Sequence, residues 1–186
     1  MYQAEILTKD EAGELLTIAR RTLENFVRHE SVAKPESHSE KLDQIYGLSC
    51  ILHGPGGTVG EAAMGIPHPV LSIIDAVIAA VTHAARDVTA DMLHEIKIEL
   101  TIMTTPQLLD YMHPAEKYFN HIVPEADGLL LRYGMYEAFL TPQAWSGQPK
   151  EKFMEELCAK AGLSEGMWKE EGIELYKFSV QVVRES

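Results

Sequence analysis

The sequence contains few cysteines and few basic residues. Two cysteines, Cys50 and Cys158, stand among 186 residues. This is too few for a disulfide framework and is typical of a reducing compartment, so we expect a cytoplasmic location. The 16 lysines and arginines are outnumbered by 28 acidic residues, which gives a formal charge of −12. Because this charge repels a phosphate backbone, the composition argues against nucleic-acid binding.

Long apolar runs are also absent. No stretch reaches 18 consecutive apolar residues, so the sequence predicts no membrane span. The first ten residues carry acids and lack a basic start with an apolar core, so they do not predict a signal peptide. The apolar fraction of 46% is that of a globular protein. The length suits one domain, or two small lobes that share a core.

Motifs for familiar cofactors and catalytic groups are missing. The glycine-rich run 54–65 lacks the lysine of a phosphate-binding loop and the third glycine of a dinucleotide fingerprint, so it predicts tight turns. The eight histidines form no paired metal-ligand motif, and we predict no metal and no cofactor. Ser72 and His83 would lie roughly 16 Å apart along one helix, too far for a nucleophile and its base. Cys158 falls on an apolar helix face and Cys50 in mid-strand, where thiols are usually inert.

Amphipathic segments make up most of the chain. Thr8 and Glu11 form a capping box, which predicts a helix over 9–29. The most apolar segment, 70–85, predicts a central core helix with Pro69 at its first position. A third helix is expected over 150–161, and 108–123 is ambiguous. Alternating apolar residues predict strands over 46–52, 58–65, 95–104, 128–133, 136–141 and a last strand through Tyr176, Phe178, Val180 and Val182.

The segments do not alternate in a βαβ rhythm. Hairpins combined with a few packed helices indicate an α+β fold with a mainly antiparallel sheet. Short characteristic sequences occur in and between these segments, in a fixed order. They are Ala19-Arg20-Arg21, Gly47 to Leu52, the helix from Val70, Ile96 to Pro106, Asp127 to Leu130, Leu140 to Gln143, Lys160 to Leu163, Trp168 and Leu175 to Phe178.

This order resembles the AMMECR-like domain, also met as protein A of the AmmeMemoRadiSam system, from roughly Leu7 to Val183. The resemblance implies one domain over residues 1–186, made of two lobes with antiparallel sheets and a cleft between them. It implies no established activity, although an enzymatic role has been suspected for the cleft. It also implies a pathway shared with a Memo-like protein and a radical SAM protein.

The sequence departs from the family at its hallmark motif. The family has Leu-Arg-Gly-Cys-Ile-Gly after the first hairpin turn, where this chain has Gly60-Glu61-Ala62-Ala63-Met64-Gly65. Glu61 therefore replaces the arginine and Ala63 replaces the cysteine. The family's Asp-Pro-Arg-Phe-Pro-Pro after the long helix is also missing. If the arginine and cysteine carry chemistry in relatives, this chain has lost it.

Two hypotheses about function follow. The first is a binding module for a small molecule or a protein, without the family's presumed chemistry. The second is an enzyme that uses cleft carboxylates and histidines for acid–base chemistry. Both take His53, Glu61, His68 and Gln143 as candidate residues, and convergence of Glu61, His68 and Gln143 in one pocket would favour the enzyme. Whether the protein is an enzyme stays open at this point.

Two further expectations concern the same region. Met64, Ile66 and the turn 67–69 would add apolar surface, which suggests a homodimer. The change from a cation to Glu61 predicts a neutral or cationic ligand, or a divalent metal held weakly, since each unit-charge contact at 4 Å is worth roughly 1–4 kcal/mol outside a dry interior. The alternative is that Glu61 is a solvated turn residue that binds nothing.

Overall fold

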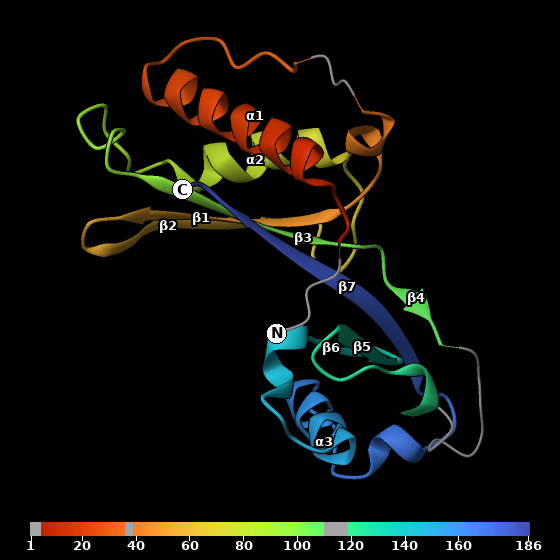
Figure 1. Cartoon of the computed structure of the whole chain (residues 1–186). Helices are drawn as coiled ribbons and strands as arrows, with labels where there is room; N and C mark the ends of the chain where they lie inside the picture. Colours follow the sequence, from red (N-terminus) through yellow and green to blue (C-terminus); the bar gives the residue numbers. More distant parts are fainter. Residues whose placement is uncertain (1–4, 36–38, 110–118) are drawn as a thin grey trace. The chain divides into compact units, whose positions relative to one another are not determined.

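A computed structural model describes residues 5–35, 39–109 and 119–186 (Figure 1). The chain divides into two compact units. Unit 1 holds the described residues of Pro106–Val180, and unit 2 holds those of Glu5–Thr105 and Gln181–Ser186. Strand β7, Glu174–Arg184, contributes its first residues to unit 1 and its last to unit 2.

Both α-helices described in unit 2 have side-chain caps. Helix α1, Lys9–Val27, begins after Thr8, whose hydroxyl accepts a hydrogen bond from the Glu11 amide while the Glu11 carboxylate accepts one from the Thr8 amide, so the expected capping box is confirmed. Helix α2, Ile73–Ala84, begins after Ser72, whose hydroxyl accepts from the Asp75 amide. The expectation that Pro69 begins this helix is therefore wrong, because the cap lies three residues later.

Three antiparallel strands form the sheet of unit 2, and the last residues of β7 lie beside β3. They are β1, Gly47–Gly54; β2, Gly57–Met64; and β3, Lys97–Met103, with β1 in the centre. Helices α1 and α2 cover one face of this sheet (Figure 1). On that face the strands present buried aliphatic side chains and Cys50, while α2 buries most of its surface, so the expected core helix and half-buried strand are confirmed. The buried strand residues are Leu48, Cys50, Leu52, Ile98, Leu100 and Ile102.

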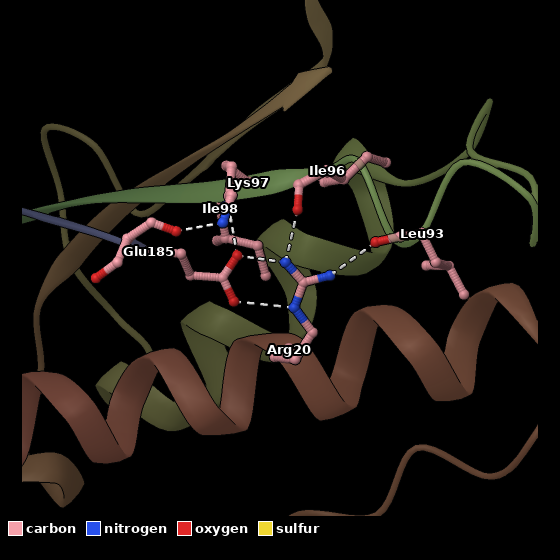
Figure 2. Close-up of polar contacts among 7 residues, drawn as sticks. Arg20, Leu93, Ile96, Lys97, Ile98 and Glu185 are labelled. Atoms are coloured by element: carbon pink, nitrogen blue, oxygen red, sulfur yellow. Dashed lines mark hydrogen bonds and ion pairs between the residues drawn. The ribbon is translucent and has the colours of Figure 1, made fainter. Parts of the chain in front are cut away.

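Arg20 ties α1 to two other parts of unit 2 (Figure 2). Its guanidinium forms a two-pronged ion pair with Glu185 and donates to the backbone oxygens of Leu93 and Ile96. The Glu185 carboxylate in turn accepts from the Ile98 amide at 2.9 Å. The end of β7 is thereby held next to β3 and α1, which positions the neighbouring Arg184.

Unit 1 is built on a hairpin and a third helix. Strands β5, Asp127–Tyr133, and β6, Tyr136–Leu140, form the expected hairpin, and β5 and β4, Gln107–Leu108, both pair with β7. Helix α3, Lys150–Lys160, packs on this hairpin. Short 3-10 helices lie at Pro142–Trp145 and Met167–Lys169 in unit 1, and at Glu40–Asp43 in unit 2.

The core of unit 1 is centred on aromatic rings. Trp145 stacks on Phe153 with ring centroids 3.7 Å apart, and the Trp145 indole donates a hydrogen bond to the Asp127 backbone oxygen. Both rings are fully buried. Together the units confirm the α+β class with antiparallel strand pairing. Most of the ambiguous segment 108–123 lies outside the described residues.

Candidate functional site

The sheet of unit 2 has a second face, opposite α1 and α2, that carries polar side chains. Side chains alternate between the two faces of a strand. Because Leu48, Cys50 and Leu52 point toward the helices, the residues between them in β1 point to this second face. We call it the polar face. Met103 is buried at one end of this face, and the following residues of the face are exposed or partly buried: Ser49, Ile51, His53, Glu61, Ala63, Lys97, Glu99 and Thr101.

A carboxylate on β3 joins two basic side chains of the polar face. Glu99 lies 3.1 Å from the His53 Nε2 and accepts a hydrogen bond at 2.8 Å from the Arg184 Nε. The Glu99 side chain is 15% exposed, against 41% for His53 and 67% for Arg184. Partial burial acts to raise the pKa of Glu99, but the hydrogen bonds and charges of Arg184 and His53 outweigh it and lower that pKa. Glu99 is therefore an ionised acceptor that orients His53.

Glu61 stands next to this cluster. It pairs with Ile51, which also pairs with Glu99 on its other side, so the three residues form one row across the sheet. His53 lies two residues along β1 from Ile51, past a shift in the β1–β2 register between Leu52 and His53, and is the diagonal neighbour of Glu61. Glu61 is exposed and forms no ion pair with another described residue.

The other two candidate residues lie elsewhere in the chain. His68 follows β2, in a turn where Pro69 packs close to Gly65. His53 pairs with Thr58, near the other end of β2. Thr58 and the last residue of β2 lie roughly 20 Å apart at 3.3 Å per residue, so His68 is far from His53. Gln143 is exposed on the 3-10 helix Pro142–Trp145 of unit 1. Of the four candidates, the geometry brings His53 and Glu61 together.

Sequence reasoning missed Glu99 and Arg184. Alternation does place Lys97, Glu99 and Thr101 on the exposed side of β3, but it does not reveal which strand lies opposite. The partners of Glu99 are 46 and 85 residues away in the sequence. Their meeting depends on the register of β1 with β3 and on the course of β7, which no local pattern encodes.

Residues Gly60 to Met64 form the second half of β2. A Cβ atom at Gly60 would lie 1.9 Å from the Ala84 backbone oxygen, so α2 approaches too closely for any larger residue. Ala63 pairs with Ser49 and presents a methyl group on the polar face. No cysteine chemistry can occur at this position.

The two cysteines are buried thiols. Cys50 points into the core of unit 2, and burial, with the charge of Glu185, raises its pKa to about 12. Cys158 lies in the core of unit 1, and burial raises its pKa as well. A thiol in this state is protonated at neutral pH and is a poor nucleophile.

Three other features of the region bear on function. Among the described residues, no three histidine, cysteine or acidic side chains gather in a way that could hold a metal ion. Nor does this part of the chain contain a helix with the length and apolar character to cross a membrane. Met64, Ile66 and Pro67 are partly buried, and Val70 is exposed, so the homodimer stays a prediction.

Comparison with known proteins gives consistent matches along the whole chain. The family model described as AMMECR1 matches residues 16–183. The protein MJ0810 of Methanocaldococcus jannaschii is 33% identical over 97% of this chain and 92% of its own length. Protein TK0174 of Thermococcus kodakarensis is 32% identical over 95% of this chain and 92% of its own length.

A solved structure has the same fold. The crystal structure of the uncharacterized protein PH0010 from Pyrococcus horikoshii matches with a TM-score of 0.74 and 25% identity. The match covers 97% of this chain and 94% of the other. The names of these relatives specify no activity, so the comparisons identify a family and a fold.

Proposed function

The chain belongs to the AMMECR1 family, and on that premise we propose that its polar face binds a small molecule that donates hydrogen bonds. The ligand is neutral or cationic. His53 and Glu61 are the recognition groups, and Glu99 and Arg184 position His53. The pathway link to Memo-like and radical SAM proteins and the cytoplasmic location stay predictions, as do roles for His68 and Gln143.

One observation carries this proposal: the polar face offers two acceptors side by side. An ionised carboxylate only accepts hydrogen bonds, so the His53 Nε2 must donate to Glu99. In a neutral imidazole the other nitrogen, Nδ1, is then an acceptor. Glu61 supplies a carboxylate from the adjacent strand, at the diagonal spacing of about 7–8 Å. A small donor such as an amine can contact both groups.

The charge of the region supports the same ligand class. Glu99 is neutralised by Arg184, whereas Glu61 has no cationic partner among the described residues. An anionic ligand would meet an uncompensated carboxylate, and a cation would pair with it. Lys97 lies on the same face, but it bonds to the Ser186 backbone oxygen.

The enzyme alternative rests on the same histidine, because a carboxylate-oriented imidazole is typical of a general base. Such a base needs a nucleophile or substrate proton within roughly 3 Å. Ser49 is four residues from His53, roughly 13 Å along the strand. Cys50 points to the opposite face with its pKa raised to about 12. Glu99 is held ionised and cannot act as an acid near neutral pH. These features favour binding over catalysis.

A ligand panel followed by NMR and thermal shift tests the proposal. The probes are 1,3-diaminopropane as the cation, glycerol as the neutral donor and inorganic phosphate as the anion. At 100 times its dissociation constant, a ligand adds about 2.7 kcal/mol of stability, which corresponds to roughly 5–10 °C at this size. We expect the diamine to stabilise the protein, with amide shifts at His53 and Glu61, and phosphate to have no effect.

Two variants make the result specific. Glu61→Gln removes the charge and should weaken diamine binding by about tenfold, which is a change of 1.4 kcal/mol in binding. Glu137→Gln is the matched control, because Glu137 is an exposed glutamate on strand β6 of the other unit. Stabilisation by phosphate that survives in Glu61→Gln would contradict the proposal, as would diamine shifts that avoid the polar face.

A further inference from the structure

Strand β2 forms an open edge of the sheet in unit 2. Among the described residues its one strand partner is β1, so no further strand lies on its other side. In an antiparallel pair, alternate residues direct their backbone N–H and C=O groups away from the partner. Within the described chain no other hydrogen bond reaches residues 57–64, and none of these residues is buried. β2 therefore presents a row of backbone donors and acceptors to solvent.

The end strand of unit 1, β6, is protected in a way that β2 is not. The Lys160 ammonium of α3 donates to the Phe139 backbone oxygen at 2.8 Å and lies 4.9 Å from the centre of the Phe139 ring. A lysine, a proline or a covering helix at an edge commonly prevents another strand from pairing there. Between Gly57 and Met64, β2 contains no lysine, arginine or proline. Its edge is open to pairing.

A bulge confines this pairing to the second half of β2. The register with β1 shifts between Leu52 and His53, because Val59 is an extra residue without a partner in β1. Such a bulge interrupts the ladder and twists the strand. Beyond it, the five residues Gly60–Met64 are in continuous register with β1. We call the outer side of these five residues the β2 edge, and it matches an added strand of similar length.

Glu61 gives the β2 edge a charge preference. Its carboxylate is exposed on the polar face and forms no ion pair with another described residue. The cations of that face are engaged elsewhere, Arg184 with Glu99 and Lys97 with a backbone oxygen. Arg86 comes just after α2, the helix that covers the other face of the sheet. A lysine or arginine opposite Glu61 on an added strand would supply the missing cation.

The same carboxylate disfavours a second copy of this chain at the β2 edge. When two Gly60–Met64 segments pair antiparallel over their full length, the two Glu61 side chains are diagonal neighbours, about 7–8 Å apart. Like charges at that spacing repel each other, and each copy has a formal charge of −12. A basic peptide meets neither obstacle, because its cation is attracted to Glu61 and to the acidic protein.

We propose that the β2 edge binds an extended basic segment of another protein, with a lysine or arginine opposite Glu61. The segment adds a strand to the sheet. Backbone hydrogen bonds along Gly60–Met64 supply affinity, and the cation supplies specificity. A peptide lysine is one form of the cationic donor in the proposed function, so the role of Glu61 rests on that proposal. The backbone pairing does not, since it depends on the open edge.

Blocked seven-residue peptides test the charge preference by isothermal calorimetry and NMR. The parent is acetyl-Thr-Thr-Val-Lys-Val-Thr-Thr-amide, and its lysine is replaced by glutamine or glutamate in two further peptides. We expect the lysine peptide to bind about two- to fivefold more tightly than the glutamine peptide, as for one cross-strand ion pair, and the glutamate peptide to bind most weakly. In hydrogen exchange, amides of alternate residues within Gly60–Met64 should gain protection.

N-methylated peptides separate strand addition from binding of the lysine side chain alone. Successive residues of a strand direct their N–H groups to opposite edges. One peptide is methylated on the backbone nitrogens of its third and fifth residues, and a matched peptide on those of its fourth and sixth. We expect one of the two to lose at least about tenfold in affinity, equivalent to 1.4 kcal/mol, and the other to bind like the parent.

Variants at two exposed positions of β2 locate the binding. Glu61→Gln should remove the preference for the lysine peptide and leave the effect of N-methylation unchanged. Ala63→Lys places a cation on the edge and should weaken binding of the lysine peptide by at least about fivefold. Ala63→Ser is the matched control, because it adds a polar group without charge, and should bind like the unaltered protein. Circular dichroism checks that each variant is folded.

Four results would overturn the proposal. They are no binding at about 5 mM lysine peptide, which would detect a dissociation constant of about 1 mM; equal effects of the two N-methylation patterns; a lysine preference that survives in Glu61→Gln; and a dimer whose β2 amides are protected without peptide, which would assign the edge to a second copy.

The diamine probe tests the proposed function separately. Binding of 1,3-diaminopropane together with equal binding of both methylated peptides would retain the small-molecule site and overturn strand addition. No diamine binding, together with the expected effect of N-methylation, would retain strand addition and overturn the small-molecule site.

Discussion

The two units fill their cores in different ways. Unit 1 contains both tryptophans, and its centre is the stack of Trp145 on Phe153, with Trp168 tilted against Phe119. The core of unit 2 is mostly leucine, isoleucine, valine and alanine from two helices and one face of a sheet. The first core has aromatic rings at its centre among aliphatic side chains, while the second is almost entirely aliphatic.

This difference shows where a binding site can be placed. In unit 2 the core uses one face of β1 and β3, so the other face is available for His53, Glu61 and Glu99. Because the two faces alternate along the same strands, a polar substitution on one need not disturb packing on the other. The difference between the cores also allows the units to be followed separately, since tryptophan fluorescence reports on unit 1 alone.

The largest expected effect breaks the aromatic core. Phe153→Ala removes a fully buried ring that stacks on Trp145, and should lower the free energy of unfolding by about 3–5 kcal/mol. Urea unfolding followed by tryptophan fluorescence measures the change. Phe153→Leu keeps most of the apolar volume and should lose less than half as much. Equal losses in the two variants would show that ring stacking and cavity size do not govern this core.

A smaller effect is expected for the contacts of Arg20 with Glu185 and the backbone of unit 2, which we call the polar clamp. Arg20→Met removes the hydrogen bonds to Glu185, Leu93 and Ile96 and leaves the Glu185 carboxylate without its ion pair. The two side chains are 24% and 18% exposed, so we expect a loss of about 1–3 kcal/mol rather than the larger value of a fully buried pair.

Hydrogen exchange gives the readout for this clamp, because the Ile98 amide donates to Glu185. Protection of that amide should fall in Arg20→Met. Arg20→Lys is the control: it keeps the charge but lacks the planar fork, so it should restore part of the protection. Unchanged exchange at Ile98 in Arg20→Met would contradict the assigned role.

The smallest effect concerns pH. The pKa of Glu99 is lowered in the folded protein, so its contribution to stability is present above about pH 4.5 and is lost as the pH falls through the lowered value. Because Arg184 is largely exposed, we expect this contribution to be below about 1 kcal/mol. An NMR titration of the Glu99 carboxyl should give a higher pKa in Arg184→Gln. The same pKa in both proteins would exclude Arg184 as a cause.

Local patterns were sufficient for most elements but not for the site. The Thr8 and Glu11 capping box and the alternation along β3 are read within a few residues, and both were correctly predicted. The predicted start of α2 was wrong. Pro69 and Ser72 are both residues that favour a helix start, and in the structure the helix begins after Ser72. Register is a long-range property, so the partners of Glu99 could not be foreseen.

The course of β7 has a consequence for synthesis on the ribosome. Unit 2 consists of Glu5–Thr105 and Gln181–Ser186, so its last pieces are made only after the whole of Pro106–Val180. At about 5–20 residues per second, those roughly 75 residues take about 4–15 s. During that time the nascent segment lacks Gln181, whose side-chain amide hydrogen-bonds to the backbone of Leu7, and Glu185, which pairs with Arg20. Newly made unit 2 is thus exposed for seconds to chaperones and proteases, until the strand that completes it emerges.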